Sequence, residues 1–109
     1  MKMIKSIIRP NKVDDVKDAL AKLNIAGMRV TEVRGHGKQK GHTAIYRGKE
    51  YNVSLLPKME IEVVVPDSMA DDAIKAIVTA ARTGEIGDGR VFVMPVQESY
   101  RIRTGEREA

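Results

Sequence analysis

Residues 59–66 read Met59-Glu60-Ile61-Glu62-Val63-Val64-Val65-Pro66. Apolar residues occupy every second position from Met59 to Val65, whereas Glu60, Glu62 and Val64 occupy the positions between them and Lys58 precedes the first. This period of two predicts a strand whose first set of side chains faces the core and whose second set faces away. We expect the strand to end at the proline, which donates no ladder hydrogen bond and biases the preceding residue toward extended geometry.

A similar unit occurs earlier in the chain, where residues 3–10 form another apolar-rich segment that ends at a proline. Each segment precedes a helical stripe of apolar residues, namely Val13, Val16, Leu20 and Leu23 in the first half and Met69, Ala73, Ile77 and Ala81 in the second. Asn11 and Ser68 are the expected N-caps, with Asp14 and Asp71 in the first turns. Glycine turns then lead to strands at 28–33 and 91–96, so the pattern is β-α-β, twice.

Two such units predict an α+β, ferredoxin-like βαββαβ fold, with a four-stranded antiparallel sheet and both helices on one face. We expect a single domain over residues 1–109. A long loop, 36–54, joins the second and third strands, and loops of this length are usually functional. A basic C-terminal segment, 97–109, follows the last strand.

The composition favours anionic partners, because 19 Lys and Arg against 15 Asp and Glu give a net charge of +4. One Phe, three Tyr and no Trp leave few surfaces for base stacking, so we expect no nucleic-acid partner. There is no Cys, which excludes disulfides and thiolate metal sites. No apolar run resembles a signal peptide or a membrane span, so we expect a cytoplasmic protein without direct membrane insertion.

Residues 83–90, which we call the glycine loop, read Thr-Gly-Glu-Ile-Gly-Asp-Gly-Arg. Three glycines and a final arginine suit the approach of backbone amides to a phosphate, although a helix C-cap at Gly84 and a tight turn explain the same residues. A second glycine-rich basic run, 35–41, suits an anion too, or is a solvated loop.

Other polar residues have two interpretations each. Arg101 and Arg103 lie two apart, so on extended chain both could grip a polyphosphate, or they belong to a charged edge strand. Lys58 could pair with a ligand carboxylate or with a neighbouring glutamate. His36 and His42 lack the further ligands of a metal site, and the loop tyrosines could simply pack. No nucleophile–base pair or acid–base carboxylate pair is evident, so we expect that the protein is not an enzyme.

These motifs together resemble the PII nitrogen-regulatory signalling proteins, from Met1 to the C-terminal segment. Residues 46–51, Tyr-Arg-Gly-Lys-Glu-Tyr, are similar to the family signature Y-[KR]-G-[AS]-[AE]-Y except at Lys49. Residues 83–93 are similar to its second signature throughout. Residues 35–41, 56–58 and 101–106 also match the family's pattern.

The resemblance implies a homotrimer that binds ATP or ADP in clefts between neighbouring subunits. Ile7 and Val64 would line the adenine, and Glu62 would meet its edge. The implied nucleotide-binding residues are Ile7, Arg29, Gly35, Gly37, Lys38, Glu62, Val64, Gly87, Asp88, Gly89, Arg90, Arg101 and Arg103. With Mg-ATP bound, 2-oxoglutarate would follow, at Gln39, Lys40, Gly41, Lys58 and Gly87. Gln39 would coordinate the Mg²⁺, and Lys58 would pair with the distal carboxylate.

The same resemblance implies that ligands reposition the long loop and so select a partner. The implied partners are an ammonium channel, whose pore would receive Arg47, and nitrogen-regulatory enzymes or kinases. Tyr51 matches a residue that a uridylyltransferase modifies in many members. The protein would be cytoplasmic and recruited to the membrane through the channel.

The chain departs from the family pattern at several positions. Arg29 replaces Thr or Ser near the nucleotide, and Lys38 and Arg90 exchange the usual cation types, which leaves the preference between ATP and ADP open. Lys49, His36 and Ser54 also depart from it, within the partner-facing loop.

Three alternatives stay open. The first is an RNA-binding module of the same topology, although only Phe92 supplies an aromatic inside a strand. The second is an acylphosphatase-like enzyme, although the sequence lacks an anion loop paired with a catalytic amide side chain early in the chain. The third is a sensor that uses the same scaffold for another effector.

Overall fold

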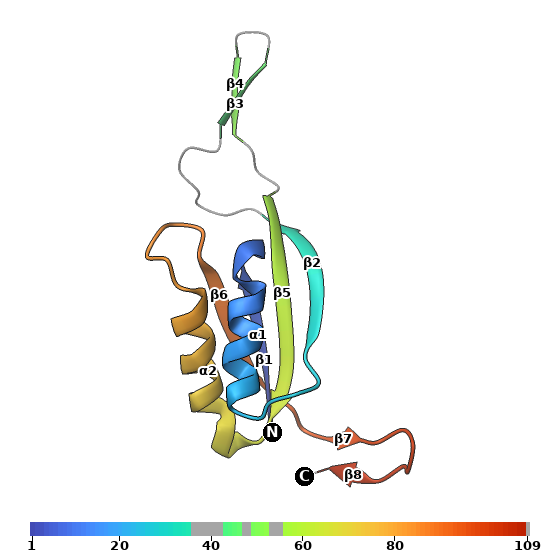
Figure 1. The fold of residues 1–109 in the computed structure, drawn as a ribbon. Coiled ribbons are helices and arrows are strands. Elements are labelled where there is room, and N and C mark those ends of the chain that lie inside the picture. The colour runs from blue at the N-terminus through green and yellow to red at the C-terminus, as the bar shows by residue number, and fades with distance from the viewer. Residues whose placement is uncertain (36–42, 47–48, 53–55, 109) are drawn as a thin grey trace.

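A four-stranded antiparallel sheet and two helices form the body of the molecule. The computed structural model describes residues 1–35, 43–46, 49–52 and 56–108. The elements of the body are β1 (Lys2–Ile8), α1 (Val13–Lys22), β2 (Arg29–Gly35), β5 (Leu56–Val65), α2 (Asp67–Ala81) and β6 (Gly89–Pro95). The strand order is β2-β5-β1-β6, and both helices cover one face (Figure 1). The predicted ferredoxin-like βαββαβ fold is confirmed.

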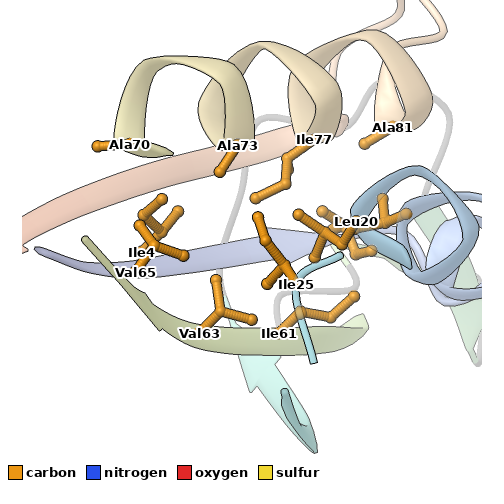
Figure 2. Packing of buried hydrophobic residues seen from close by; sticks show 12 residues of the cluster. Ile4, Leu20, Ile25, Ile61, Val63, Val65, Ala70, Ala73, Ile77 and Ala81 are labelled. Carbon is orange, nitrogen blue, oxygen red and sulfur yellow. The ribbon is translucent and has the colours of Figure 1, made fainter. Parts of the chain in front are cut away.

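The core lies between the helices and the sheet. Ile61, Val63 and Val65 of β5 are buried, as the alternation along that strand predicts. Figure 2 shows Ile77 of α2 and Leu20 of α1 among these strand residues. The opposite side of the sheet, which we call the open face, carries the alternate residues of each strand, including Lys58 and Glu62. The predicted orientation of both side chains is therefore confirmed.

Ser6 is the one buried polar side chain among the described residues. Its hydroxyl donates a hydrogen bond of 3.2 Å to the backbone carbonyl of Ile61, so its burial leaves no unsatisfied donor. The contact also joins β1 to β5, the two central strands of the sheet.

Both helices begin differently from the N-cap prediction. Before α1, a short 3-10 turn, η1 (Pro10–Lys12), starts at the proline, so Lys12 rather than Asn11 occupies the cap position. Helix α2 begins at Asp67, directly after Pro66, which places Ser68 inside the first turn. Neither helix has a side-chain cap hydrogen bond, so both predicted N-caps are wrong. The N-terminal ammonium instead lies 3.1 Å from an Asp67 carboxylate oxygen at the start of α2.

Two short hairpins extend this body. Within the predicted loop 36–54, β3 (Thr43–Tyr46) pairs with β4 (Lys49–Asn52), and Tyr46 lies opposite Lys49. Thr, Ile and Tyr favour strands, and such a register leaves only residues 47–48 between them. After β6, β7 (Ser99–Tyr100) pairs with β8 (Arg107–Glu108). The long connection therefore contains strands that were not predicted.

Candidate functional site

The glycine loop leads from α2 to β6 and is closed by one of its own carboxylates. Asp88 Oδ2 accepts hydrogen bonds from the backbone amides of Thr83 and Gly84, at 2.8 and 2.9 Å. Its Oδ1 accepts another from the Thr83 hydroxyl. The Thr83 hydroxyl holds the pKa of the Asp88 carboxyl far below its usual range, with help from the two amides and from Arg9. Asp88 thus stays ionised and shapes the loop.

Gly84 is not the C-cap of α2, so that interpretation of the glycine is wrong. Helix α2 ends at Ala81, and Arg82 occupies the cap position, with its amide donating to the Val78 carbonyl. Gly84 has a φ of 90° and follows two residues later. The positive φ of Gly84 therefore belongs to the backbone of the glycine loop and not to the end of the helix.

Two cations contact the glycine loop, Arg9 directly after β1 and Lys58 of β5. Arg9 Nε lies 3.1 Å from Asp88 Oδ1, and the same guanidinium donates to the Ile86 carbonyl at 3.0 Å. Lys58 Nζ donates to the Gly87 carbonyl at 2.8 Å. Lys58 therefore contacts the glycine loop rather than Glu60 or Glu62, the neighbours considered from the sequence.

The charges around Lys58 make this end of the sheet receptive to an anion. Burial lowers the pKa of the Lys58 ammonium, and the positive charge of Arg9 lowers it further, whereas Asp88 opposes the shift. A carboxylate or phosphate beside Lys58 and Arg9 would favour the charged ammonium. The arrangement can thus bind an anionic ligand without any change of fold.

A second polar group lies further along the open face. Arg29 and Glu62 face each other across β2 and β5, and Arg29 Nη2 lies 2.6 Å from Glu62 Oε1. Lys5 of β1 lies 3.7 Å from Glu62 Oε2 and 3.9 Å from Glu60 Oε1. Glu62 is only 12% exposed, so its carboxylate is largely shielded from water.

The predicted nucleotide residues divide between the two ends of the sheet. The end beside the glycine loop holds Ile7, Gly35, Gly87, Asp88, Gly89 and Arg90. Arg29 and Val64 lie toward the other end, and Glu62 lies opposite Arg29. Arg29 and Gly35 are the first and last residues of β2, about 20 Å apart at the usual rise of a strand.

Arg101 and Arg103 do not lie on extended chain. The structure has a turn from Ile102 to Thr104, and Arg101 precedes it without strand pairing. The prediction that both guanidinium groups face one way along a strand is therefore wrong, because the hairpin β7–β8 reverses the chain here. Arg101 pairs with Glu108 inside the hairpin. In Figure 1 this hairpin lies at the end of the sheet opposite to the glycine loop.

Several predicted residues lie outside the part of the chain that the structure describes. These are Gly37, Lys38, Gln39, Lys40, Gly41 and Arg47, and with them His36, His42 and Ser54. The backbone of Tyr51 belongs to β4 and lies opposite Ala44.

The described ranges hold neither a cluster of metal ligands nor a membrane-spanning helix. In those ranges no three His, Cys, Asp or Glu side chains gather as a metal site would require. None of the helices there is long and apolar enough to cross a membrane.

Arg9 is the site residue that the sequence did not indicate. It follows β1 directly, and its position continues the open-face alternation of Lys5 and Ile7. The start of β6 lies beside the end of β1, which brings Asp88 within reach of the guanidinium. The alternation alone could have placed Arg9 on the open face, but not against the glycine loop.

Comparison with known proteins agrees with the fold and the motifs. A family model described as Nitrogen regulatory protein P-II matches residues 1–106. The chain is 56% identical over 106 residues to Nitrogen regulatory protein P-II of Haemophilus influenzae, covering 97% of this chain and 95% of that protein. It is 56% identical over 108 residues to Nitrogen regulatory protein P-II 1 of Escherichia coli K12, covering 99% and 96%. Nitrogen regulatory protein P-II of Azospirillum brasilense is 58% identical over 107 residues, covering 98% and 96%.

Proposed function

The chain belongs to the nitrogen regulatory protein P-II family, and from this premise we propose that it is a nitrogen signal transducer rather than an enzyme. It binds ATP or ADP and, together with Mg-ATP, 2-oxoglutarate. The observation that carries the proposal is the 2.8 Å contact between Lys58 Nζ and the Gly87 carbonyl. Two residues expected to bind the same effector, 29 positions apart in sequence, meet at a loop that is suited to phosphate.

The distribution of the expected nucleotide residues supports a site shared between copies. The glycine loop and the C-terminal hairpin with Arg101 and Arg103 lie at opposite ends of the sheet (Figure 1). A nucleotide that contacts both needs the glycine loop of one subunit and the hairpin of a neighbour. A homotrimer supplies such neighbours by closed symmetry, and association also covers the open face.

In the proposed effector site, Lys58 pairs with the distal carboxylate of 2-oxoglutarate, and Arg9 keeps the glycine loop in place through Asp88. The two cations and the loop amides fit an anionic ligand. Mg²⁺ on ATP would neutralise phosphate charge, and the amide oxygen of Gln39, with Lys40 and Gly41 beside it, is the type of ligand that it prefers. Because Lys58 also contacts the Gly87 carbonyl, binding of the effector to Lys58 would then change the contacts of the glycine loop.

The output of the proposed switch is the segment 36–54, which joins β2 to β5. Strand β2 ends and strand β5 begins at the glycine-loop end of the sheet, and Lys58 lies near the start of β5 at that end. A ligand held there can favour one conformation of the segment over another, and the conformation selects the partner. We propose an ammonium channel that receives Arg47, and nitrogen-regulatory enzymes or kinases, as partners of a cytoplasmic protein. Uridylylation of Tyr51 by a uridylyltransferase would add negative charge and block insertion into the channel.

Titration calorimetry of the purified chain tests the proposal. We expect ATP with Mg²⁺ to bind first, and 2-oxoglutarate to give heat only when both are present. Lys58→Met should abolish the heat of 2-oxoglutarate, since the variant lacks the cation for its distal carboxylate, whereas Lys75→Met on the exposed side of α2 should not. An absence of heat from ATP and ADP would refute nucleotide sensing. Heat from ATP without any from 2-oxoglutarate would point to a different effector.

A further inference from the structure

The Arg29–Glu62 ion pair presents a donor and an acceptor side by side on the open face. Its two side chains differ in exposure, since Arg29 is 70% exposed and Glu62 only 12%. One guanidinium N–H is engaged with Glu62 Oε1, and a guanidinium carries about five N–H donors in all. Arg29 can therefore keep the pair and still donate to a third group.

The position of this pair matters under the proposed function, on which this inference rests. The resemblance to the PII proteins implies that Glu62 meets the edge of the purine base. Val64, two positions further along β5 on the same face, is 45% exposed and offers the base an apolar surface. Arg29 lies directly opposite Glu62, so its free N–H groups lie at the same edge of the base.

Purines differ in polarity at ring position 6, where adenine carries an amino donor and guanine a carbonyl acceptor. A carboxylate accepts hydrogen bonds but donates none, so Glu62 alone suits adenine and repels the guanine O6. An arginine donates only, and its contact with guanine O6 and N7 is the commonest specific base contact of proteins. The pair thus offers a partner for either group at position 6.

We propose that Arg29, paired with Glu62, admits 6-oxopurine nucleotides such as GTP and ITP to the site that also binds ATP. Glu62 accepts from the adenine amino group, and Arg29 donates to the O6 of guanine or hypoxanthine. Lys5, 3.7 Å from the other carboxylate oxygen, is a second cation partner of Glu62 while Arg29 donates to the base. Arg29 is then a residue that determines base specificity.

Binding of ATP, GTP and ITP, each with Mg²⁺, to the full chain tests this inference by calorimetry. We expect the Kd of GTP and of ITP to lie within about tenfold of the Kd of ATP. Arg29→Thr should raise the Kd of GTP and ITP by about tenfold or more, and that of ATP by less than about threefold. Since ITP lacks the 2-amino group of GTP, equal behaviour of the two assigns the effect to position 6.

Two further variants test whether the change in base preference is specific to the Arg29–Glu62 pair. Arg34→Thr removes a cation from the same strand on the opposite face and should change none of the three affinities. Glu62→Gln should shift the preference the other way, by weakening ATP more than GTP. Circular dichroism checks that each variant is folded.

Several results would overturn the inference. One is binding of ATP without binding of GTP and ITP, which leaves the proposed function intact. Another is an equal loss of ATP and GTP in Arg29→Thr, which makes Arg29 a general phosphate cation. Failure of all three nucleotides to bind would overturn the proposed function as well.

Discussion

At the scale of single residues, Gly89 is where the backbones of β1 and β6 approach too closely for a side chain. A Cβ built there would lie 1.7 Å from the Ile7 carbonyl oxygen, and its φ is 104°. We expect Gly89→Ala to lower the free energy of unfolding by about 3 kcal/mol or more, because the contact is with backbone that cannot move aside. Urea denaturation measures the loss.

Gly27→Ala is the matched control for Gly89→Ala. Gly27 also has a positive φ, 75°, but a Cβ there would have no neighbour within 4 Å. Its replacement should cost only the backbone strain, about 1–2 kcal/mol. Equal losses in the two variants would show that the close approach at Gly89 does not matter.

Also at the residue scale, the ionised Asp88 makes the stability of the glycine loop depend on pH. Its pKa is lower in the folded chain than its ordinary value of 3.8, so the folded state binds fewer protons. The stabilisation is complete above the unfolded pKa and is lost as the pH falls from about 4 toward the folded pKa. The Thr83 hydroxyl is the largest cause, so Thr83→Val should move the pKa of Asp88 upward.

Carbon-13 NMR of the Asp88 carboxyl, followed from pH 6 to pH 2, measures this change. The wild-type signal should stay that of a carboxylate to lower pH than the signal of Thr83→Val. Thr79→Val, on the exposed side of α2, should leave the titration of Asp88 unchanged. Identical titrations in wild type and Thr83→Val would remove the hydroxyl as the cause.

At the scale of elements, α2 approaches the sheet closely because its buried face is built mainly from alanines. Ala70, Ala73 and Ala81 lie on this face with Ile77, as Figure 2 shows, and Ala73 is fully buried. We expect Ala73→Leu to destabilise the fold by about 1–3 kcal/mol, because the larger side chain forces the helix away from β1. Thr79→Leu, on the exposed side of the same helix, should change the midpoint of thermal unfolding little. Tolerance of leucine at Ala73 would mean that the layer has spare volume.

The elements also show how far the sequence predicts this structure. The period of two in β5 and the helical stripes predicted the strands, the helices and the orientation of Ile61 correctly, because burial of one face dominates both patterns. The N-caps at Asn11 and Ser68 were wrong because prolines just before each helix set its first turn. The turn after Arg101 depends on pairing with residues 107–108, and the contact between Arg9 and Asp88 spans 79 positions. Local sequence patterns do not predict contacts of this kind.

At the scale of the whole molecule, the open face is the surface that the proposed homotrimer would cover. Phe92 and Val64 lie on it and are 46% and 45% exposed, whereas α1 and α2 cover the other face. Phe92→Glu should prevent association, because burial of an added carboxylate between copies is costly. The variant should still fold, since Lys5 lies directly across the β1–β6 pair and can partner the new charge.

Light scattering on a sizing column measures the mass. The wild type should give about three times the chain mass of 12.1 kDa, and Phe92→Glu should give the mass of one chain. Thr79→Glu, on the helix side, should remain associated. Because the glycine loop and the Arg101 hairpin lie at opposite ends of one chain, the monomeric variant should also lose most of its nucleotide affinity. A monomer that still binds ATP as tightly as the wild type would mean that one chain holds the whole site.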